Sequence, residues 1–507
     1  MVSIKLKVAL QVLAVVLSVF SLGLIVLSSS ASSLVSRIAK GQANLESEDV
    51  LENFISPPVP VYQRIYMFNL TNSKEVRKGA KPSVDEIGPY VFRVDMLKKN
   101  VTLRDGILSF KQYKAYHFVP ELSGGLSLQD QIITVNPILH FFFLTVDSFD
   151  NNTHLRRPLF FKKTVDELLY NGFEDDILDN LEDTDIPTYE GRVGYLVGTN
   201  NTIEGAYEVF SGSDEDRGKL NNIISFFGRR HFTYYEEPCN EVEGSNGELY
   251  PPFSAAPESI ALFNPQLCRP WALHFNGSVS KNGLQLARFV AKDDFLSATG
   301  NATVDECLDL HDGADWKALF NAAPCHNSIP VWLSLPHFLK ADATLLSDVV
   351  GLSPDPKKHE VYLDVYPKVG FTVDMRIRVQ VNLKLKRGPK DGQTPEVIYP
   401  ILWQEIMVYP EGSAKIARIL YEKVELPRAL LTRISVVLAV LCFIAALVCV
   451  GIRLRLSDTS VSLDAVTGPY PPNWKLLGME FSSREPSNAE TGRELVIKTF
   501  RTEKLCH

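Results

Sequence analysis

The chain has 507 residues, of which 45% are hydrophobic and 22% are charged, as in an ordinary globular protein. Its formal net charge is −8 and its lysines and arginines form no dense block, which argues against a nucleic-acid partner. The length allows one very large domain or two to three ordinary ones.

Near the N-terminus, residues 8–27 form an apolar run without a charge. As a helix this run would span roughly 30 Å, the thickness of one hydrocarbon core, which predicts a transmembrane helix after a short cytosolic segment, residues 1–7. The alternative is a cleaved signal peptide, because Lys5 and Lys7 provide a basic start. The apolar part of a signal peptide is usually shorter than about 15 residues, which favours the uncleaved anchor.

The region between the anchor and the next apolar run begins with strand patterns. Residues 58–70 and 87–96 alternate in the manner of half-buried strands. Residues 164–183 carry apolar side chains at helical spacing and open with Thr164 and Glu167 as a capping box, which predicts a helix. The spacing in 136–149 fits a helix or a strand. The sequence thus predicts a mixed, mainly β domain.

Glycosylation sequons and cysteines indicate on which side of the membrane this region lies. The sequons all fall between the two apolar runs, and their number only modestly exceeds chance. Four cysteines cluster in the second half of the region without a CxxC pair, which favours two disulfides and a non-cytosolic compartment. We therefore expect residues 28–433 to form one extracellular or lumenal domain. The candidate glycosylation sites are Asn69, Asn100, Asn151, Asn200, Asn276 and Asn301.

The stretch "CHNSIPVWLSLPHFL", residues 325–339, could belong to a metal site, a Cys–His nucleophile or a disulfide. A metal site would need further ligands at suitable spacing, and none follow in the sequence. A nucleophile would need a free thiol, which an oxidising compartment disfavours. We therefore expect Cys325 to be disulfide-bonded, and His326 and His337 to be polar residues on a strand and a turn.

Residues 371–386 give the clearest strand signal, because apolar and polar residues alternate throughout. At about 3.3 Å per residue the strand would be roughly 50 Å long, which suits a large antiparallel sheet or barrel with one apolar face. Residues 396–409 are predicted to be the returning strand.

A second uncharged run, residues 434–452, predicts another transmembrane helix, so both termini would lie in the cytosol. The tail, residues 453–507, is rich in Ser, Thr, Pro and charged residues, which is typical of a disordered segment. Cys449 near the inner end of this span is a candidate for palmitoylation, although an ordinary apolar span residue explains it equally well.

The sequence lacks the motifs of the common catalytic sites. "GSDEDRGKL", residues 212–220, has the wrong spacing for a phosphate-binding loop, and neither G-x-S-x-G nor H-E-x-x-H occurs. We therefore expect no enzyme, no catalytic residue, no metal site and no cofactor. A two-span ion channel is disfavoured, since 434–452 offers few polar groups to line a pore.

Several long motifs resemble the class B scavenger receptor family, which includes fatty acid translocase, the high-density lipoprotein receptor, lysosomal integral membrane protein type 2 and insect sensory neuron membrane proteins. The resemblance implies an α+β, mainly antiparallel β-barrel ectodomain anchored by two transmembrane helices. It also implies an apical helical bundle at about 136–183 and a lipid-accessible tunnel towards the membrane. The motifs are "PPVPVYQRIYMFNLTN" (57–72), "EIGPYVF" (86–92), "TVDELLY" (164–170), "YYEEPCNEVEG…YPPF" (234–253), "LCRPWALHF" (267–275), "PVWLSLPHFLKAD" (330–342), "HEVYLDVYPKVGFTV" (359–373) and "VIYPILWQE" (397–405).

The same resemblance implies the cysteine pairing and a ligand site. Its disulfide pattern gives Cys239–Cys307 and Cys268–Cys325. The apical helices bind ligand in the family, and this chain has a basic cluster there that could meet anionic lipid or lipoprotein; a solvated helix face is the alternative. Pro158 inside the expected helix and the sequon at Asn151 count against the cluster. Its members are Arg156, Arg157, Lys162 and Lys163.

The resemblance favours a cell-surface receptor that binds lipoproteins or lipids, namely fatty acids, sterols and phospholipids, and passes hydrophobic ligand through the tunnel to the membrane. The alternative is a lysosomal membrane protein that carries a lumenal hydrolase or exports lysosomal sterol. The tail's one Leu-Leu pair, Leu476–Leu477, lacks the upstream acid of a lysosomal sorting signal, which favours the plasma membrane. Homo-oligomerisation is left open.

Overall fold

The computed structural model describes residues 2–137, 159–175, 191–213, 215–235, 237, 240–265, 269–293, 296, 317–325, 331–385 and 397–464. Contacts divide the chain into two units. One is Phe20–Leu441, and the other joins the two ends, Met1–Val19 and Cys442–His507. The following description concerns the first unit unless stated otherwise.

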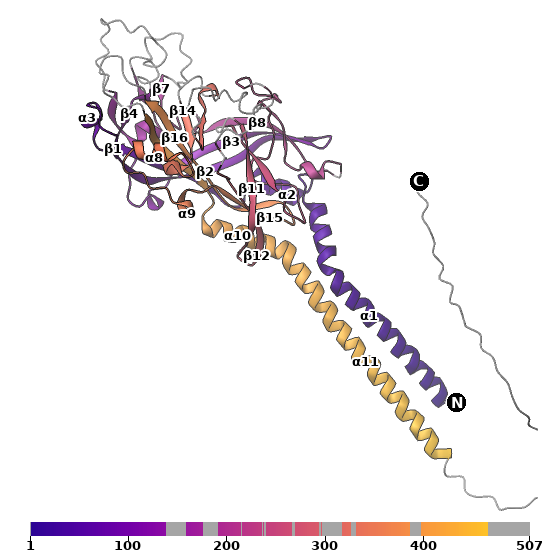
Figure 1. Cartoon of the computed structure of the whole chain (residues 1–507). Coiled ribbons are helices and arrows are strands. Elements are labelled where there is room, and N and C mark those ends of the chain that lie inside the picture. The colour runs from indigo at the N-terminus through magenta and orange to yellow at the C-terminus, as the bar shows by residue number, and fades with distance from the viewer. Residues whose placement is uncertain are drawn as a thin grey trace, which may run out of the picture. The chain divides into compact units, whose positions relative to one another are not determined.

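Most of the first unit is one large antiparallel sheet of 13 strands (Figure 1). Its main order is β10-β11-β12-β15-β16-β17-β1-β2-β3-β8-β9, and β14 pairs with both β13 and β16. Separate two-stranded sheets are β4-β5 and β6-β7. The strands are β1 (Val61–Leu70), β2 (Val84–Arg104), β3 (Ile107–Phe118), β4 (Gln131–Val135), β5 (Phe160–Thr164), β6 (Phe173–Glu174), β7 (Arg192–Val193), β8 (Thr202–Phe210), β9 (Ile223–Phe226), β10 (Ser259–Asn264), β11 (Arg269–Lys281), β12 (Leu284–Val290), β13 (Leu319–Asn321), β14 (Val331–Ser334), β15 (Tyr362–Tyr366), β16 (Phe371–Leu385) and β17 (Val397–Met407).

Two helices are long and apolar enough to cross a membrane, α1 and the helical segment that ends in α11. Within the first unit they touch where Ser21 Oγ donates a hydrogen bond to the carbonyl oxygen of Ala439, at 2.9 Å. The helices and single helical turns are α1 (Val2–Gln42), α2 (Glu48–Ile55), α3 (Ser73–Val76), η1 (Pro120–Leu122), α5 (Val165–Leu169), η2 (Arg217–Lys219), η4 (Ala323–Cys325), η5 (Pro336–Phe338), α8 (Ala343–Asp348), α9 (Pro356–His359), α10 (Pro410–Leu420), η6 (Tyr421–Glu425) and α11 (Leu426–Asp464).

The sheet is nearly closed into a barrel, because a short segment joins its two edge strands. The backbone N–H of Ile223 in β9 donates to the carbonyl oxygen of Gly244, at 2.8 Å. The next residue, Ser245, donates to Ala261 in β10 at 3.0 Å and accepts from Phe263 at 2.7 Å. The expected large antiparallel sheet with barrel character is thereby confirmed.

The predicted strand at 371–386 is confirmed as β16, and its predicted return as β17. The polar residues of β16 are nevertheless buried too. Gln380 and Asn382 are 0% exposed. Gln380 accepts a hydrogen bond from the backbone N–H of His337, at 2.6 Å, and Asn382 donates to Ser334 Oγ at 3.0 Å. The segment from β14 to η5 therefore covers this face, and the alternation separates an apolar face from a hydrogen-bonded one.

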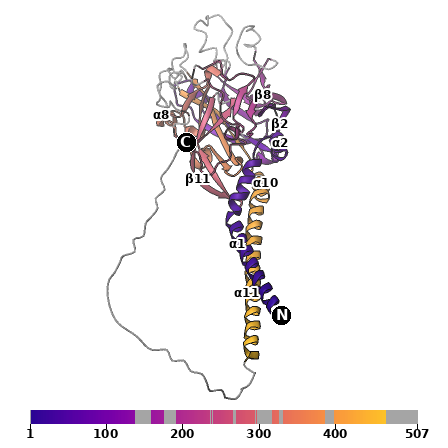
Figure 2. The ribbon, with the colours of Figure 1, turned by 90° about the vertical axis from the view of Figure 1, so that its right-hand side faces the viewer.

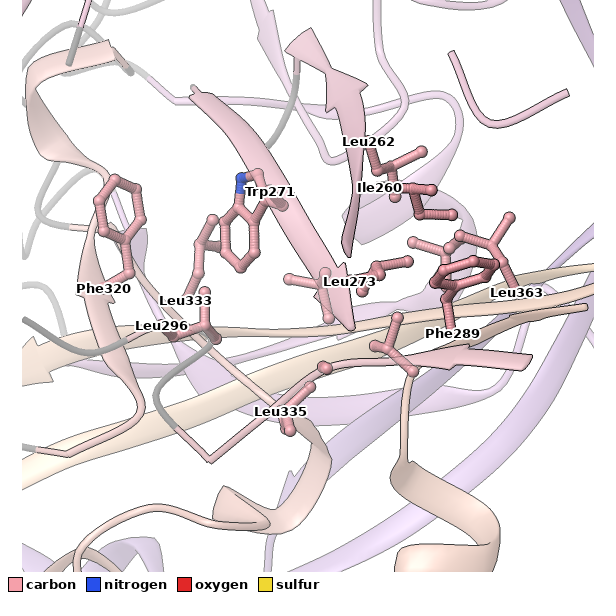
Figure 3. Packing of buried hydrophobic residues seen from close by; sticks show 14 of the residues in the cluster. Ile260, Leu262, Trp271, Leu273, Phe289, Leu296, Phe320, Leu333, Leu335 and Leu363 are labelled. Carbon is pink, nitrogen blue, oxygen red and sulfur yellow. The ribbon is translucent and has the colours of Figure 1, made fainter. Parts of the chain in front are cut away.

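Part of the interior is filled by side chains (Figure 3). Trp271 and Leu273 of β11 pack in one buried cluster with Phe289 and Leu363, from neighbouring strands. The rings of Trp271 and Phe320 meet edge to face with centroids 6.0 Å apart. This cluster is a packed core that fills the barrel around Trp271 and Leu273.

α10 and η6 pack against the sheet, and Figure 2 shows α10 next to the strands. Ile416 and Val424 share a buried cluster with Val61 of β1 and Leu284 and Leu286 of β12. The apolar face of the helical segment that leads into α11 is thus held against the sheet.

The helix predicted over 164–183 is wrong in its extent. The capping box is present, since Glu167 N–H donates to Thr164 Oγ1 at 3.2 Å, but α5 ends at Leu169. Gly172 then adopts φ +73° and β6 follows. A left-handed residue ends the helical turn, and this outweighs the apolar spacing beyond it. Of the apical region expected at about 136–183, 138–158 and 176–183 lie outside the described residues.

We predict that Gly244→Val destabilises the barrel by about 2 kcal/mol, because a side chain there is strained by the backbone conformation. Gly244 has φ +91°, and a Cβ would lie 2.9 Å from the Cβ of Ala261. Thermal unfolding of the detergent-solubilised chain would measure the effect. Gly218→Val is the matched control, since nothing lies within 4 Å of its Cβ. Equal unfolding temperatures for the two variants would contradict the closing role of Gly244.

Candidate functional site

A cavity of about 150 Å³ lies inside the sheet. A cavity of this size can hold a benzene-sized group. Side chains alternate along a strand, so the inward residues of several strands meet here. The apolar lining includes Val61, Val94, Met96, Leu363, Val373, Met375, Ile377, Ile406 and Val408.

The cavity also has charged lining on one side. Lys114 of β3 and Glu204 of β8 form an ion pair with a shortest Nζ–Oε distance of 2.5 Å. Glu248 lines the cavity as well, and its carboxylate pairs with Lys98 of β2 at 2.8 Å. Gln63 of β1 lines the cavity and hydrogen-bonds Gln404 of β17. An otherwise apolar space is therefore bordered by paired polar groups.

A second cavity, of about 290 Å³, lies beside the helices that lead towards the membrane spans. Its walls come from the C-terminal part of α1, from α2, and from α10 and η6. Asp49 and Lys423 both line it and form an ion pair at 2.7 Å. Its apolar lining includes Val35, Ile38, Ala39, Val50, Val369, Ile419, Leu420, Val424 and Pro427.

The two cavities share part of their walls. Asn53, Pro58, Phe371 and Ile416 line both. These four residues therefore form a wall common to the cavity inside the sheet and the cavity beside α1 and α10. A ligand that moved between the two spaces would pass Phe371 and Ile416, which are apolar.

His337, from the stretch at 325–339, lies on the opposite, covered face of the sheet. Its Nε2 is 2.5 Å from Glu86 Oε2, and its Nδ1 accepts from the backbone N–H of Ser353 at 3.1 Å. Its ring stacks on that of His359, with centroids 4.5 Å apart. His337 is thus buried in a hydrogen-bonded cluster. Among the described residues no group of three or more His, Cys, Asp or Glu could hold a metal ion.

Cys325 is disulfide-bonded, as the sequence predicts. Its partner lies outside the described residues, as do Cys239, Cys268 and Cys307. The pairing Cys239–Cys307 and Cys268–Cys325 therefore stays a prediction. Cys449 has a free thiol, and its palmitoylation also stays a prediction.

The basic cluster expected on apical helices lies only partly within the described residues, so its formation stays a prediction. Lys162 and Lys163 lie on strand β5, where adjacent side chains point to opposite faces. Lys163 pairs with Glu167 at 2.9 Å, whereas Lys162 is exposed. A helical placement of these two lysines is therefore wrong. Arg156 and Arg157 lie outside the described residues.

The sequons differ in accessibility. Asn100 and Asn276 are exposed. Asn200 accepts from the backbone N–H of Tyr116 at 2.8 Å and donates through Nδ2 to Tyr170 Oη at 2.7 Å. The nitrogen that would carry a glycan at Asn200 is thus engaged inside the protein, and Asn100 and Asn276 are the more accessible acceptors. The other sequons are Asn69, which is half-buried, and Asn151 and Asn301, which lie outside the described residues.

The sequence prediction missed the charged lining of the cavity. Phe110, Gln112, Lys114 and Tyr116 occupy alternate positions of β3, and the last three line the cavity. A lysine within such a row of apolar and aromatic residues was the one available signal. The sequence around Glu204 and Glu248 gave no such signal. A β-bulge brings Glu204 close to Lys114, and a loop that is distant in sequence brings Glu248 close to Lys98.

Comparison with known proteins identifies similar chains. The sequence profile of the CD36 family matches residues 12–453. Scavenger receptor class B member 1 of Mus musculus is 31% identical over 364 residues, which cover 69% of this chain and 70% of that protein. Lysosome membrane protein 2 of Homo sapiens is 28% identical over 407 residues, covering 76% and 84%. Sensory neuron membrane protein 1 of Antheraea polyphemus is 26% identical over 419 residues, covering 73% and 76%.

The histidine cluster predicts that acid destabilises the fold. Burial, with His337 alongside, lowers the pKa of His359 from 6.5 to about 4. The unfolded chain therefore binds a proton first as the pH falls, and the free energy of unfolding should drop by at most about 3 kcal/mol between pH 6.5 and pH 4. Burial acts to raise the pKa of Glu86, but hydrogen bonds from His337 and Trp403 lower it overall. Its stabilising contribution is lost as the pH falls through that pKa, in the same direction.

His359→Gln should flatten this pH dependence, because the amide stays neutral at both ends of the range. Unfolding midpoints measured at several pH values between 7 and 4 would check it. His117→Gln is the control, since His117 lies half-exposed beside Asp95 on the sheet. A His359→Gln protein that loses stability as steeply as the wild type would show that His359 is not responsible.

Proposed function

Since this chain belongs to the CD36 family, we propose that it is a membrane-anchored receptor that binds lipids or lipoproteins and passes hydrophobic ligand through its barrel to the membrane. The relatives' names include a scavenger receptor, which supports a receptor role. The observation that supports this path, which we call the conduit, is that the cavity inside the sheet and the second cavity, beside α1 and α10, share part of their walls.

The physical advantage of such a path is the avoidance of water. Each CH₂ group exposed to water costs about 0.8 kcal/mol, so a long acyl chain or a sterol leaves its donor slowly. Apolar walls such as Val373, Met375 and Ile377 replace that contact with water along the way. The direction of movement then follows the concentration gradient of the lipid, and the protein has to supply only the path.

The side chains at the shared wall would act as the narrowest part of the path. Phe371 and Ile416 border both cavities, and Ile416 lies on α10, which leads into the second candidate span. A ligand could pass by displacement of these apolar side chains, without the opening of a polar contact.

We predict that Ile416→Trp lowers protein-dependent transfer of cholesterol roughly tenfold. The larger indole would block the wall shared by the two cavities, because its close-packed neighbours leave no room for it to move aside. Transfer of radiolabelled cholesterol from donor vesicles to proteoliposomes containing the protein would measure it. Arg418→Trp is the control on the same helix, since Arg418 is 80% exposed and lines neither cavity. Unimpaired transfer by Ile416→Trp would contradict the conduit.

The cellular site of action separates the two candidate functions. A relative named as a lysosome membrane protein keeps the lysosomal alternative open, as a carrier of a hydrolase or an exporter of sterol. We propose the plasma membrane, because Leu476–Leu477 lacks an upstream acid. The tagged chain should therefore colocalise with a surface marker; accumulation with a lysosomal marker would favour the alternative.

A further inference from the structure

Four charged side chains inside the sheet form two ion pairs that we call the polar arc: Lys98 with Glu248, and Lys114 with Glu204. Lys98 is 0% exposed and also donates to the carbonyl oxygen of Phe54 at 2.7 Å. Lys114, Glu204 and Glu248 line the cavity and keep 13%, 18% and 22% of their side chains exposed. The polar arc therefore faces the space that the lipid would occupy.

A β-bulge aims Glu204 at Lys114. Gln112 pairs with Gly205 and Tyr113 with Ile203, so Glu204 is the extra residue of β8. Bulges redirect side chains and often lie near functional sites. The bulge needs the neighbouring glycine, because a Cβ on Gly205 would lie 2.6 Å from the ring of Tyr207. The local fold of β8 thus positions one carboxylate beside the cavity.

The wall supplied by β15 and β16 is mainly apolar, with Leu363, Val373, Met375 and Ile377. Asp374 of β16 also lines the cavity, and its carboxylate is paired with Lys281 and Arg376. The cavity thus has a mainly apolar wall and a polar one. An amphiphile whose small polar group lies at the polar arc would have its large hydrocarbon part extend past Phe371 and Ile416 into the second cavity, because the cavity of about 150 Å³ holds only part of it.

The charges of the polar arc balance, because each lysine faces a glutamate. Burial acts to lower the pKa of Lys114, but Glu204 raises it above its ordinary value, so the lysine remains charged and paired. An ionised carboxylate of a fatty acid beside Lys114 would lie next to Glu204 and leave the polar arc with an uncompensated negative charge, which is costly away from water. A hydroxyl can donate to a glutamate and accept from a lysine while both pairs stay intact.

We propose that the polar arc selects lipids with a neutral hydroxyl group, such as sterols and acylglycerols, over ionised fatty acids. This inference rests on the proposed function, because it assumes that lipid enters the cavity. Glu204 is the residue that sets the selectivity, since it neutralises the lysine nearest to the ligand.

The test compares binding of radiolabelled cholesterol and oleate by the detergent-solubilised full chain in a scintillation proximity assay at neutral pH. The wild type should bind cholesterol more tightly than oleate. In Glu204→Gln, Lys114 loses its partner, so oleate affinity should rise roughly tenfold while cholesterol affinity falls. Glu208→Gln is the matched control on the same strand, where Glu208 is exposed and bonds Ser225; it should behave as the wild type.

A second variant separates an unmasked charge from general loosening of the fold. Lys114→Met combined with Glu204→Met removes the pair together, so cholesterol affinity should fall without a gain for oleate. If neither affinity changes in Glu204→Gln while Ile416→Trp still blocks transfer, the selectivity is wrong and the conduit stands. If Ile416→Trp leaves transfer intact, the conduit itself is wrong.

Discussion

Closure of the sheet is the constraint on which the rest of this structure depends. The strands of a large twisted sheet can enclose a space only when the edges meet, and here β9 and β10 meet through the backbone of Gly244 and Ser245. The same contacts pair backbone groups of both edges, at Ile223 in β9 and at Ala261 and Phe263 in β10, which would otherwise be free to pair with another chain. The cavity, its charged lining and its route towards α10 all follow from this arrangement.

One part of the space inside the barrel is filled by side chains, and another part is a cavity. Around Trp271 and Leu273 the interior is filled in the manner of an ordinary core. Beside Val373 and Met375 it is open, and the opening reaches the walls of a second cavity next to α1 and α10. A barrel that combines both regions is stabilised by its core and still has room for an apolar guest. The buried ion pairs beside the open region fit this division, since charges away from water need partners as close as Glu204 is to Lys114.

The sequence predicted the features that depend on local pattern. The long alternation of β16, its return as β17 and the capping box at Thr164 are local, and the structure has all three. The extent of the helix after Thr164 was wrong, because one glycine in the left-handed region outweighed the apolar spacing. Gly244, the bulge at Glu204 and the burial of His337 against Glu86 join segments far apart in sequence, and no local pattern announces such contacts. The family resemblance implied a tunnel, which stays a proposal, and the arrangement of charges around the cavity inside the sheet depends on contacts that only the fold brings together.

The most direct test of a lipid path through the barrel is photo-crosslinking of the full chain with a diazirine cholesterol, followed by mapping of the labelled peptides. If lipid occupies the two cavities that share part of their walls, label should appear in residues 371–377 of β16 and in α10, and excess cholesterol should compete it away. Label confined to the lipid-facing residues of α1 and α11, with none in β16, would contradict the account.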